Sequence, residues 1–171
     1  LHVRSLYSLI STGTERLVAR GQVPKELYEF MGIPSMEGSF EFPLTYGYSL
    51  VGQVDEPGHS WHQKNVHCLH PHQSAARLPA EQLSIVPDGI PPLRATLASN
   101  METILNAIWD SEVQVGSRVL VVGFGMIGGL LSRVLSQMPA LTLLVAETDT
   151  TRQQLATQMG FELWQGEGAF D

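Results

Sequence analysis

Residues 119–128 read Val-Leu-Val-Val-Gly-Phe-Gly-Met-Ile-Gly, an apolar run that leads into three spaced glycines. A continuous apolar strand is typical of a parallel sheet that is covered on both faces. Gly123 permits a tight turn, Gly125 lets the backbone approach a pyrophosphate, and Gly128 lets the next helix pack closely on the strand. The stretch therefore predicts a dinucleotide-binding turn between a strand and a helix.

The helix that opens after Gly125 is expected to supply the remaining phosphate contacts. The first amide groups of a helix, here those of Met126 and Ile127, have no partner within the helix. Together with the helix dipole they favour an anion at this end. Gly123, Gly125, Gly128 and these two residues are thus the predicted cofactor-binding residues of the turn.

A second apolar strand, 141–146, ends at Glu147, roughly 20 residues after the last glycine of the turn, as the nucleotide fingerprint requires. An acidic side chain there accepts hydrogen bonds from ribose hydroxyls and repels a 2′-phosphate. We therefore expect NAD as the cofactor, with NADP as the alternative and Asp149 as a rival for the acidic role. A methyltransferase that binds S-adenosylmethionine shares these features and remains a third possibility.

The surrounding sequence predicts two domains, a strand-rich one over 1–92 and a nucleotide-binding one over 93–171. Before Pro91-Pro92 the chain has short strands separated by turns, which is typical of a compact barrel. After it, apolar residues at helical spacing predict a helix over 93–109, and strands then alternate with helices. That order predicts a parallel sheet, so the fold class is α/β.

Composition excludes several classes of protein. The net charge of −7 weighs against a nucleic-acid partner, which requires a basic face. The apolar runs are strand-sized, so we expect no membrane segment. One cysteine, Cys68, rules out an internal disulfide and fits a cytoplasmic location. Because residue 1 is Leu and already lies in a predicted strand, we expect the chain to be part of a longer protein.

Five motifs in order make the chain resemble the medium-chain dehydrogenase/reductase superfamily, the relatives of zinc-type alcohol dehydrogenases. They are 10–15, 46–54, 86–89, 100–109 and 123–128. The resemblance implies a GroES-like β-barrel domain followed by the amino-terminal part of a Rossmann doubly wound parallel sheet. It also implies hydride transfer between NAD(P) and an alcohol, a carbonyl or an activated double bond of a small-molecule substrate, in a homodimer.

A narrower similarity, over Ser11 to Gly21, is to bacteriochlorophyllide dehydrogenase. The departures from the superfamily concern the metal. Where zinc-dependent members have ligands, this chain has Thr12, Tyr48 and Ser99. Catalytic zinc needs three nitrogen, sulfur or carboxylate ligands. We therefore expect no catalytic zinc, and assign the chain to a zinc-independent branch.

The resemblance also suggests which residues act in catalysis. Thr14 matches the hydroxyl that relays a proton in family members, and the Tyr48 phenol stands where a metal ligand would point, so it can donate to a substrate carbonyl. Thr103 lies on the helix that runs toward the nicotinamide and is a further expected cofactor-binding residue. Cys68, His70 and His72 face one side of an extended segment, and whether they bind a metal stays open.

Three functions follow from the sequence. The leading one is a zinc-independent oxidoreductase that uses Thr14 and Tyr48. The second is a catalytically silent nucleotide-binding or structural relative, whose lost ligands mark lost chemistry. The third is the methyltransferase, against which the strand-rich first half weighs.

Overall fold

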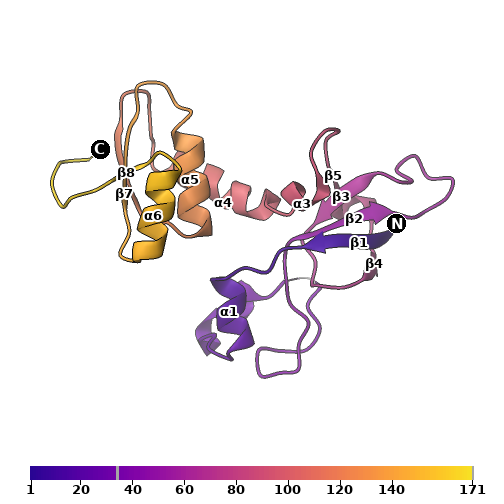
Figure 1. The fold of residues 1–171 in the computed structure, drawn as a ribbon. Coiled ribbons are helices and arrows are strands. Elements are labelled where there is room, and N and C mark those ends of the chain that lie inside the picture. The colour runs from indigo at the N-terminus through magenta and orange to yellow at the C-terminus, as the bar shows by residue number, and fades with distance from the viewer. Residues whose placement is uncertain (34, 171) are drawn as a thin grey trace. The chain divides into compact units, whose positions relative to one another are not determined.

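A computed structural model describes residues 1–33 and 35–170, and it divides the chain into two compact units, Leu1–Ser99 and Asn100–Asp171 (Figure 1). The division falls within helix α4 (Ala98–Asp110). The domain boundary expected between residues 92 and 93 stays a prediction.

The first unit is built on a five-stranded sheet in which all neighbouring strands are antiparallel. The strands, in spatial order, are β4 (Ala75–Arg77), β1 (His2–Ser8), β2 (Leu50–Val54), β3 (Asn65–Cys68) and β5 (Ser84–Ile85). Strand β4, which has three residues and no clear alternation, was not expected from the sequence. One face buries an apolar cluster: Val3, Leu50, Val54, Val66, Cys68, Leu78 and Leu83.

Strand β2 contains a glycine because strand β1 approaches it closely. Gly52 lies opposite Ser5, next to the point where the β1–β2 register shifts. A Cβ at Gly52 would lie 2.4 Å from the Val3 side chain and 2.7 Å from the Arg4 carbonyl oxygen. Glycine inside a strand often marks a bulge or a close backbone approach. That expectation for the 46–54 segment is confirmed.

Residues 11–46 form a second, smaller core beside the sheet. Helix α1 (Thr14–Ala19) is followed by a 3₁₀ helix (Lys25–Leu27) and the short helix α2 (Tyr28–Met31). Buried Val18, Val23 and Phe40 form its centre. Aromatic rings extend this core, as Phe40 packs edge-on against Tyr46 with ring centroids 5.6 Å apart.

The helix expected as one piece over 93–109 is two helices, so that expectation was wrong in its continuity. Helix α3 (Pro92–Ala95) ends at Thr96, and α4 (Ala98–Asp110) starts afresh. The Thr96 hydroxyl donates to the carbonyl of Leu93 at 2.7 Å. Threonine side chains that bond back to a preceding carbonyl compete with helix continuation. Helical spacing alone does not reveal this interruption.

The second unit contains a parallel sheet in the order β6 (Arg118–Val122), β7 (Thr142–Ala146) and β8 (Glu162–Leu163). Helices α5 (Met126–Leu135) and α6 (Thr150–Gln158) connect these strands and lie against one face of the sheet (Figure 1). Between them, Phe124, Val145, Ala156 and Phe161 form the core. No helix in the described parts of the chain is long and apolar enough to cross a membrane.

We expect Gly52→Ala to lower the free energy of unfolding of the first unit by about 1–3 kcal/mol, because the added methyl group overlaps the Val3 side chain and the Arg4 backbone. Gly13→Ala is the matched control, since the nearest atom to a Cβ there is 3.9 Å away. Urea unfolding followed by circular dichroism measures both. Equal stability of the two variants would contradict the close approach of β1 to β2.

Candidate functional site

The glycine-rich turn between β6 and α5 is closed at one glycine and open at another. Gly123 has φ +94°, a conformation that favours glycine. A Cβ at Gly128 would lie 1.9 Å from the Gly123 carbonyl oxygen, so only glycine permits this approach of helix to strand end. A Cβ at Gly125, by contrast, would meet nothing within 4 Å. The space beside Gly125 is therefore free of protein atoms.

Helix α5 begins at this open position. Gly125 precedes the helix with φ −77° and ψ −165°, and no side chain caps the helix. Met126 and Ile127, in the first turn, are exposed. Since the first amide groups of a helix lack partners within it, they can donate to an anion placed beside Gly125. The buried Phe124 ring packs at 5.6 Å from that of Phe161 and anchors the turn.

Glu147, at the end of β7, is bound to the turn through its carboxylate. Its Oε2 accepts from the Phe124 amide at 2.7 Å. Its Oε1 accepts from the amides of Thr148 and Asp149 at 2.7 and 2.9 Å. The Asp149 and Phe124 amides are the main cause of a pKa lowered to about 2, to which the Thr148 amide and the charge of Arg152 add. Glu147 is therefore a carboxylate at neutral pH.

Asp149, the alternative candidate for the acidic side chain that binds the ribose, caps a helix instead. It caps helix α6, because its Oδ1 accepts from the Arg152 amide at 3.0 Å. An aspartate at this position satisfies an amide that the helix itself leaves unpaired. Glu147 thus remains the acidic side chain that contacts the turn.

The expected catalytic residues lie in the first unit and are not joined to each other. Thr14 is the first residue of α1 and Tyr48 lies just before β2; both are half-buried. Within the described residues no hydrogen bond connects the two side chains. The Tyr48 ring packs edge-on against Tyr46, with centroids 6.4 Å apart. Thr103, expected at the cofactor, is exposed on α4 in the part of that helix that belongs to the second unit.

A carboxylate–histidine pair joins Glu15, the residue after Thr14, to His72, whose ring lies against Gly47, the residue before Tyr48. Glu15 Oε2 is 2.6 Å from His72 Nε2, and the two side chains are 8 % and 28 % exposed respectively. Because a carboxylate only accepts, Nε2 carries the hydrogen in this bond. The pair could not be predicted from the sequence. The acidic residue directly after Thr14 was visible, but nothing local joins it to a histidine far along the chain.

Tyr46 lies between this pair and the aromatic core. Its hydroxyl donates to the Met31 carbonyl at 2.8 Å. Burial raises its pKa, and the charges of Tyr48 and Glu15 raise it further. Tyr46 is therefore a neutral donor that fixes the end of helix α2.

Cys68, His70 and His72, which share one side of the segment in sequence, have separate partners. Burial raises the pKa of the Cys68 thiol to about 11, and its Sγ donates to the Leu50 carbonyl. His70 is buried, with Nδ1 3.1 Å from the Pro71 carbonyl oxygen. Among the described residues, no three His, Cys, Asp or Glu side chains are grouped so that they could hold a metal ion.

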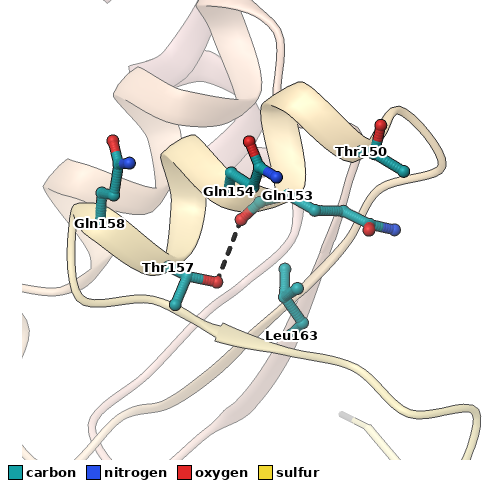
Figure 2. Close-up of a pocket in the computed structure, with 6 residues that line it drawn as sticks. All are labelled: Thr150, Gln153, Gln154, Thr157, Gln158 and Leu163. Atoms are coloured by element: carbon teal, nitrogen blue, oxygen red, sulfur yellow. Dashed lines mark hydrogen bonds between the residues drawn. The ribbon is translucent and has the colours of Figure 1, made fainter.

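A hollow of about 450 Å³ on helix α6 shares no residue with the glycine turn. Figure 2 shows its lining of neutral amide and hydroxyl groups, with the Thr157 hydroxyl bonded to the Gln153 carbonyl at 3.0 Å. The six lining residues are Thr150, Gln153, Gln154, Thr157, Gln158 and Leu163. Because it holds no charged group and no residue of the turn, we do not assign the nucleotide to it.

Comparison with known proteins identifies the fold. No family model and no curated protein sequence matches the chain. Solved structures do match it, among them a quinone oxidoreductase from Thermus thermophilus (TM-score 0.69, 19 % identity) and an alcohol dehydrogenase from Thermus sp. ATN1 (TM-score 0.73, 18 % identity). A quinone oxidoreductase from Escherichia coli, solved with NADPH, matches with a TM-score of 0.71 at 15 % identity. The chain therefore shares its fold with these solved oxidoreductases.

The chain spans about half the length of these proteins. The three matches cover 95 %, 95 % and 98 % of this chain but 50 %, 55 % and 51 % of theirs. In the terms of this fold, the antiparallel unit is a GroES-like domain and the parallel unit is the first part of a Rossmann sheet. At identities of 15–19 % the likeness establishes the fold and not the activity.

Of the three positions that the superfamily resemblance assigns to metal ligands, Ser99 belongs to a polar network with Ser49 and His67. The Ser99 hydroxyl donates to the Tyr48 carbonyl at 3.0 Å, which fixes the backbone before β2. His67 Nε2 lies 3.4 Å from the hydroxyl oxygens of both Ser49 and Ser99. Thr12, at the third position, is exposed. Hydroxyl groups and an imidazole thus satisfy one another here.

Because the pKa of Glu147 is lowered in the native state, the stability of the fold depends on pH in the acidic range. Because its pKa is about 2 in the fold and about 4.5 without it, the group stabilises the native state above pH 4.5, and this contribution is lost as the pH falls toward 2. We expect Glu147→Gln to lose less stability than the wild type between pH 4.5 and pH 2. Thermal unfolding across this range measures the difference, and parallel curves for the two proteins would contradict the assignment.

Proposed function

We propose that the chain is part of a zinc-independent oxidoreductase that transfers a hydride between NAD(P) and an alcohol, a carbonyl or an activated double bond. The observation that carries the proposal is the turn itself. It is closed by Gly128 against the Gly123 carbonyl and open at Gly125. An open glycine at a helix start, beside a deprotonated Glu147, suits a diphosphate joined to a ribose.

The residues at this end of the sheet fit a dinucleotide. Gly125, with the amides of Met126 and Ile127, would hold the diphosphate, and Gly123 and Gly128 would set the shape of the turn. Glu147 would bind the adenosine ribose, since three amides already orient its carboxylate and the pKa of about 2 keeps it charged. When bound, the nicotinamide supplies the hydride chemistry, which the protein only orients.

Glu147 favours NAD over NADP in this proposal. A permanent negative charge beside the ribose repels a 2′-phosphate. Three of the structurally similar proteins were solved with NADPH or NADP, so selectivity at this position would distinguish this chain from them. Arg152, whose Nη1 lies 3.9 Å from Glu147 Oε2, offsets part of that charge.

The proton-handling groups of the proposal are in the first unit. Thr14 would relay a proton and the Tyr48 phenol would donate to the substrate oxygen. A phenol can serve there in place of a metal, because the ligand positions hold Thr12, Tyr48 and Ser99. A homodimeric assembly, a small-molecule substrate and a cytoplasmic location complete the proposal.

The second candidate is a catalytically silent relative that binds the nucleotide without turnover. The specific observation in its favour is that no hydrogen bond joins Thr14 to Tyr48 within the described residues, so a relay between them would need a substrate to complete it. The antiparallel first unit weighs against the methyltransferase alternative, because the chain shares its fold with a solved alcohol dehydrogenase.

The proposal is tested by NADH titration followed by fluorescence. We expect Gly125→Val to weaken NADH binding by at least about tenfold, because side-chain atoms would fill the space beside the helix start. Gly129→Ala is the matched control one position after the turn, where a Cβ would only touch the Phe124 ring at 3.8 Å. Equal NADH affinity of both variants, or no NADH binding by the wild type, would refute the site.

Cofactor selectivity gives an independent test of Glu147. We expect the wild type to bind NADH more tightly than NADPH, and Glu147→Gln to narrow that difference by about tenfold, since the charge that repels the 2′-phosphate is removed. Competition titrations with both nucleotides measure the ratio. A ratio that the substitution leaves unchanged would contradict the assigned role. Turnover of NADH with a quinone or aldehyde panel then separates the enzyme from its silent relative.

A further inference from the structure

The Glu15–His72 pair joins two segments that are 57 positions apart in the chain. A buried carboxylate is costly unless it is paired and hydrogen-bonded. Glu15 is 8 % exposed, and His72 Nε2 at 2.6 Å is the partner that offsets this cost. The contact is charge-assisted and short, which is typical of the stronger hydrogen bonds in proteins.

The Glu15 end of the pair is fixed to the segment that carries Thr14. Its second carboxylate oxygen, Oε1, accepts from the Ser11 amide at 3.0 Å. Glu15 therefore bridges the turn at residues 11–13 to the first turn of helix α1, in which Thr14 precedes it. Because Glu15 directly follows Thr14, this contact constrains the backbone at the start of helix α1.

The His72 end is fixed to the segment that carries Tyr48. The His72 amide donates to the Tyr46 carbonyl at 3.2 Å. A Cβ at Gly47 would lie 2.8 Å from ring atoms of His72, so the imidazole lies directly against this glycine. Gly47 has φ +134°, a conformation that L side chains rarely adopt. The residue after it is Tyr48.

The Tyr48 hydroxyl makes no hydrogen bond within the part of the chain that the structure describes, whereas its backbone and ring are both held. Ser99 bonds its carbonyl, and the Tyr46 ring packs against its ring. Tyr46 is in turn bonded to Met31. The position of the phenol is thus set by the backbone of residues 46–48, on which His72 lies.

We propose that Glu15 and His72 are positioning residues, a hydrogen-bonded pair that fixes the Tyr48 phenol relative to Thr14. This inference rests on the proposed function only in the proton-handling roles of those two hydroxyls. His72 acts through Gly47 and Tyr46, and Glu15 acts through the start of helix α1. The pair provides a side-chain hydrogen bond between the two candidate catalytic segments.

The test places 3-fluorotyrosine at position 48 in the full chain and records its ¹⁹F line. His72→Phe keeps a ring against Gly47 but removes the donor, and we expect it to shift the line by more than its width. His72→Gln keeps a donor at the reach of Nε2, so we expect the wild-type line. Glu56→Gln is the control carboxylate in the same unit; it accepts from the His2 amide and we expect it to leave the line unchanged.

The outcomes separate this inference from the proposed function. The positioning role is supported if the ¹⁹F line shifts in His72→Phe and in Glu15→Ala but not in His72→Gln. This holds whether or not NADH binds. Coincident lines in wild type and His72→Phe overturn it, even if NADH binding is intact. If Glu15→Ala does not fold, the comparison of His72→Phe with His72→Gln alone decides. If the protein turns over substrate, His72→Phe should lower kcat, and its affinity for NADH should equal that of the wild type.

Discussion

The contact of Gly128 with the carbonyl of Gly123 is the constraint on which the second unit depends. At this approach no Cβ fits, so helix α5 starts directly at the end of strand β6, beside the open space at Gly125. Glu147 then fastens the neighbouring strand to the same turn through the Phe124 amide. Two strand ends and a helix start are thereby joined at the edge where we propose that the nucleotide binds, and a site that is ordered before binding lowers the cost of association.

In the first unit, polar side chains around Tyr48 are held by hydrogen bonds to one another and to the backbone. The network of Ser49, His67 and Ser99 satisfies hydroxyl and imidazole groups against each other and against backbone carbonyls. The Glu15 carboxyl group, which is 8 % exposed, has His72 as its hydrogen-bond partner. Removing one partner of such a pair leaves an uncompensated buried group, which costs far more than the pair contributes. The arrangement is therefore sensitive to single substitutions.

The features that could be predicted from the sequence are those that depend on residues close together in the chain. The glycine turn, the apolar strands β6 and β7 and the acid at Glu147 follow from local spacing, and the fold class follows from their order. The features that could not be predicted depend on contacts between segments that are far apart in the chain. The two-residue strand β8 forms only because β7 offers it a pairing edge, and Glu15 meets His72 only after the sheet has folded. The break at Thr96 was missed because one side-chain hydrogen bond interrupts an otherwise helical spacing.

The most direct test of the account is the amide spectrum of the ¹⁵N-labelled chain during titration with NADH. The account predicts saturable shifts of the amides of Gly125, Met126, Ile127 and Gly128, with a smaller response to NADPH at equal concentration. Shifts confined to other residues, or no shift at these four up to saturating nucleotide, would contradict it.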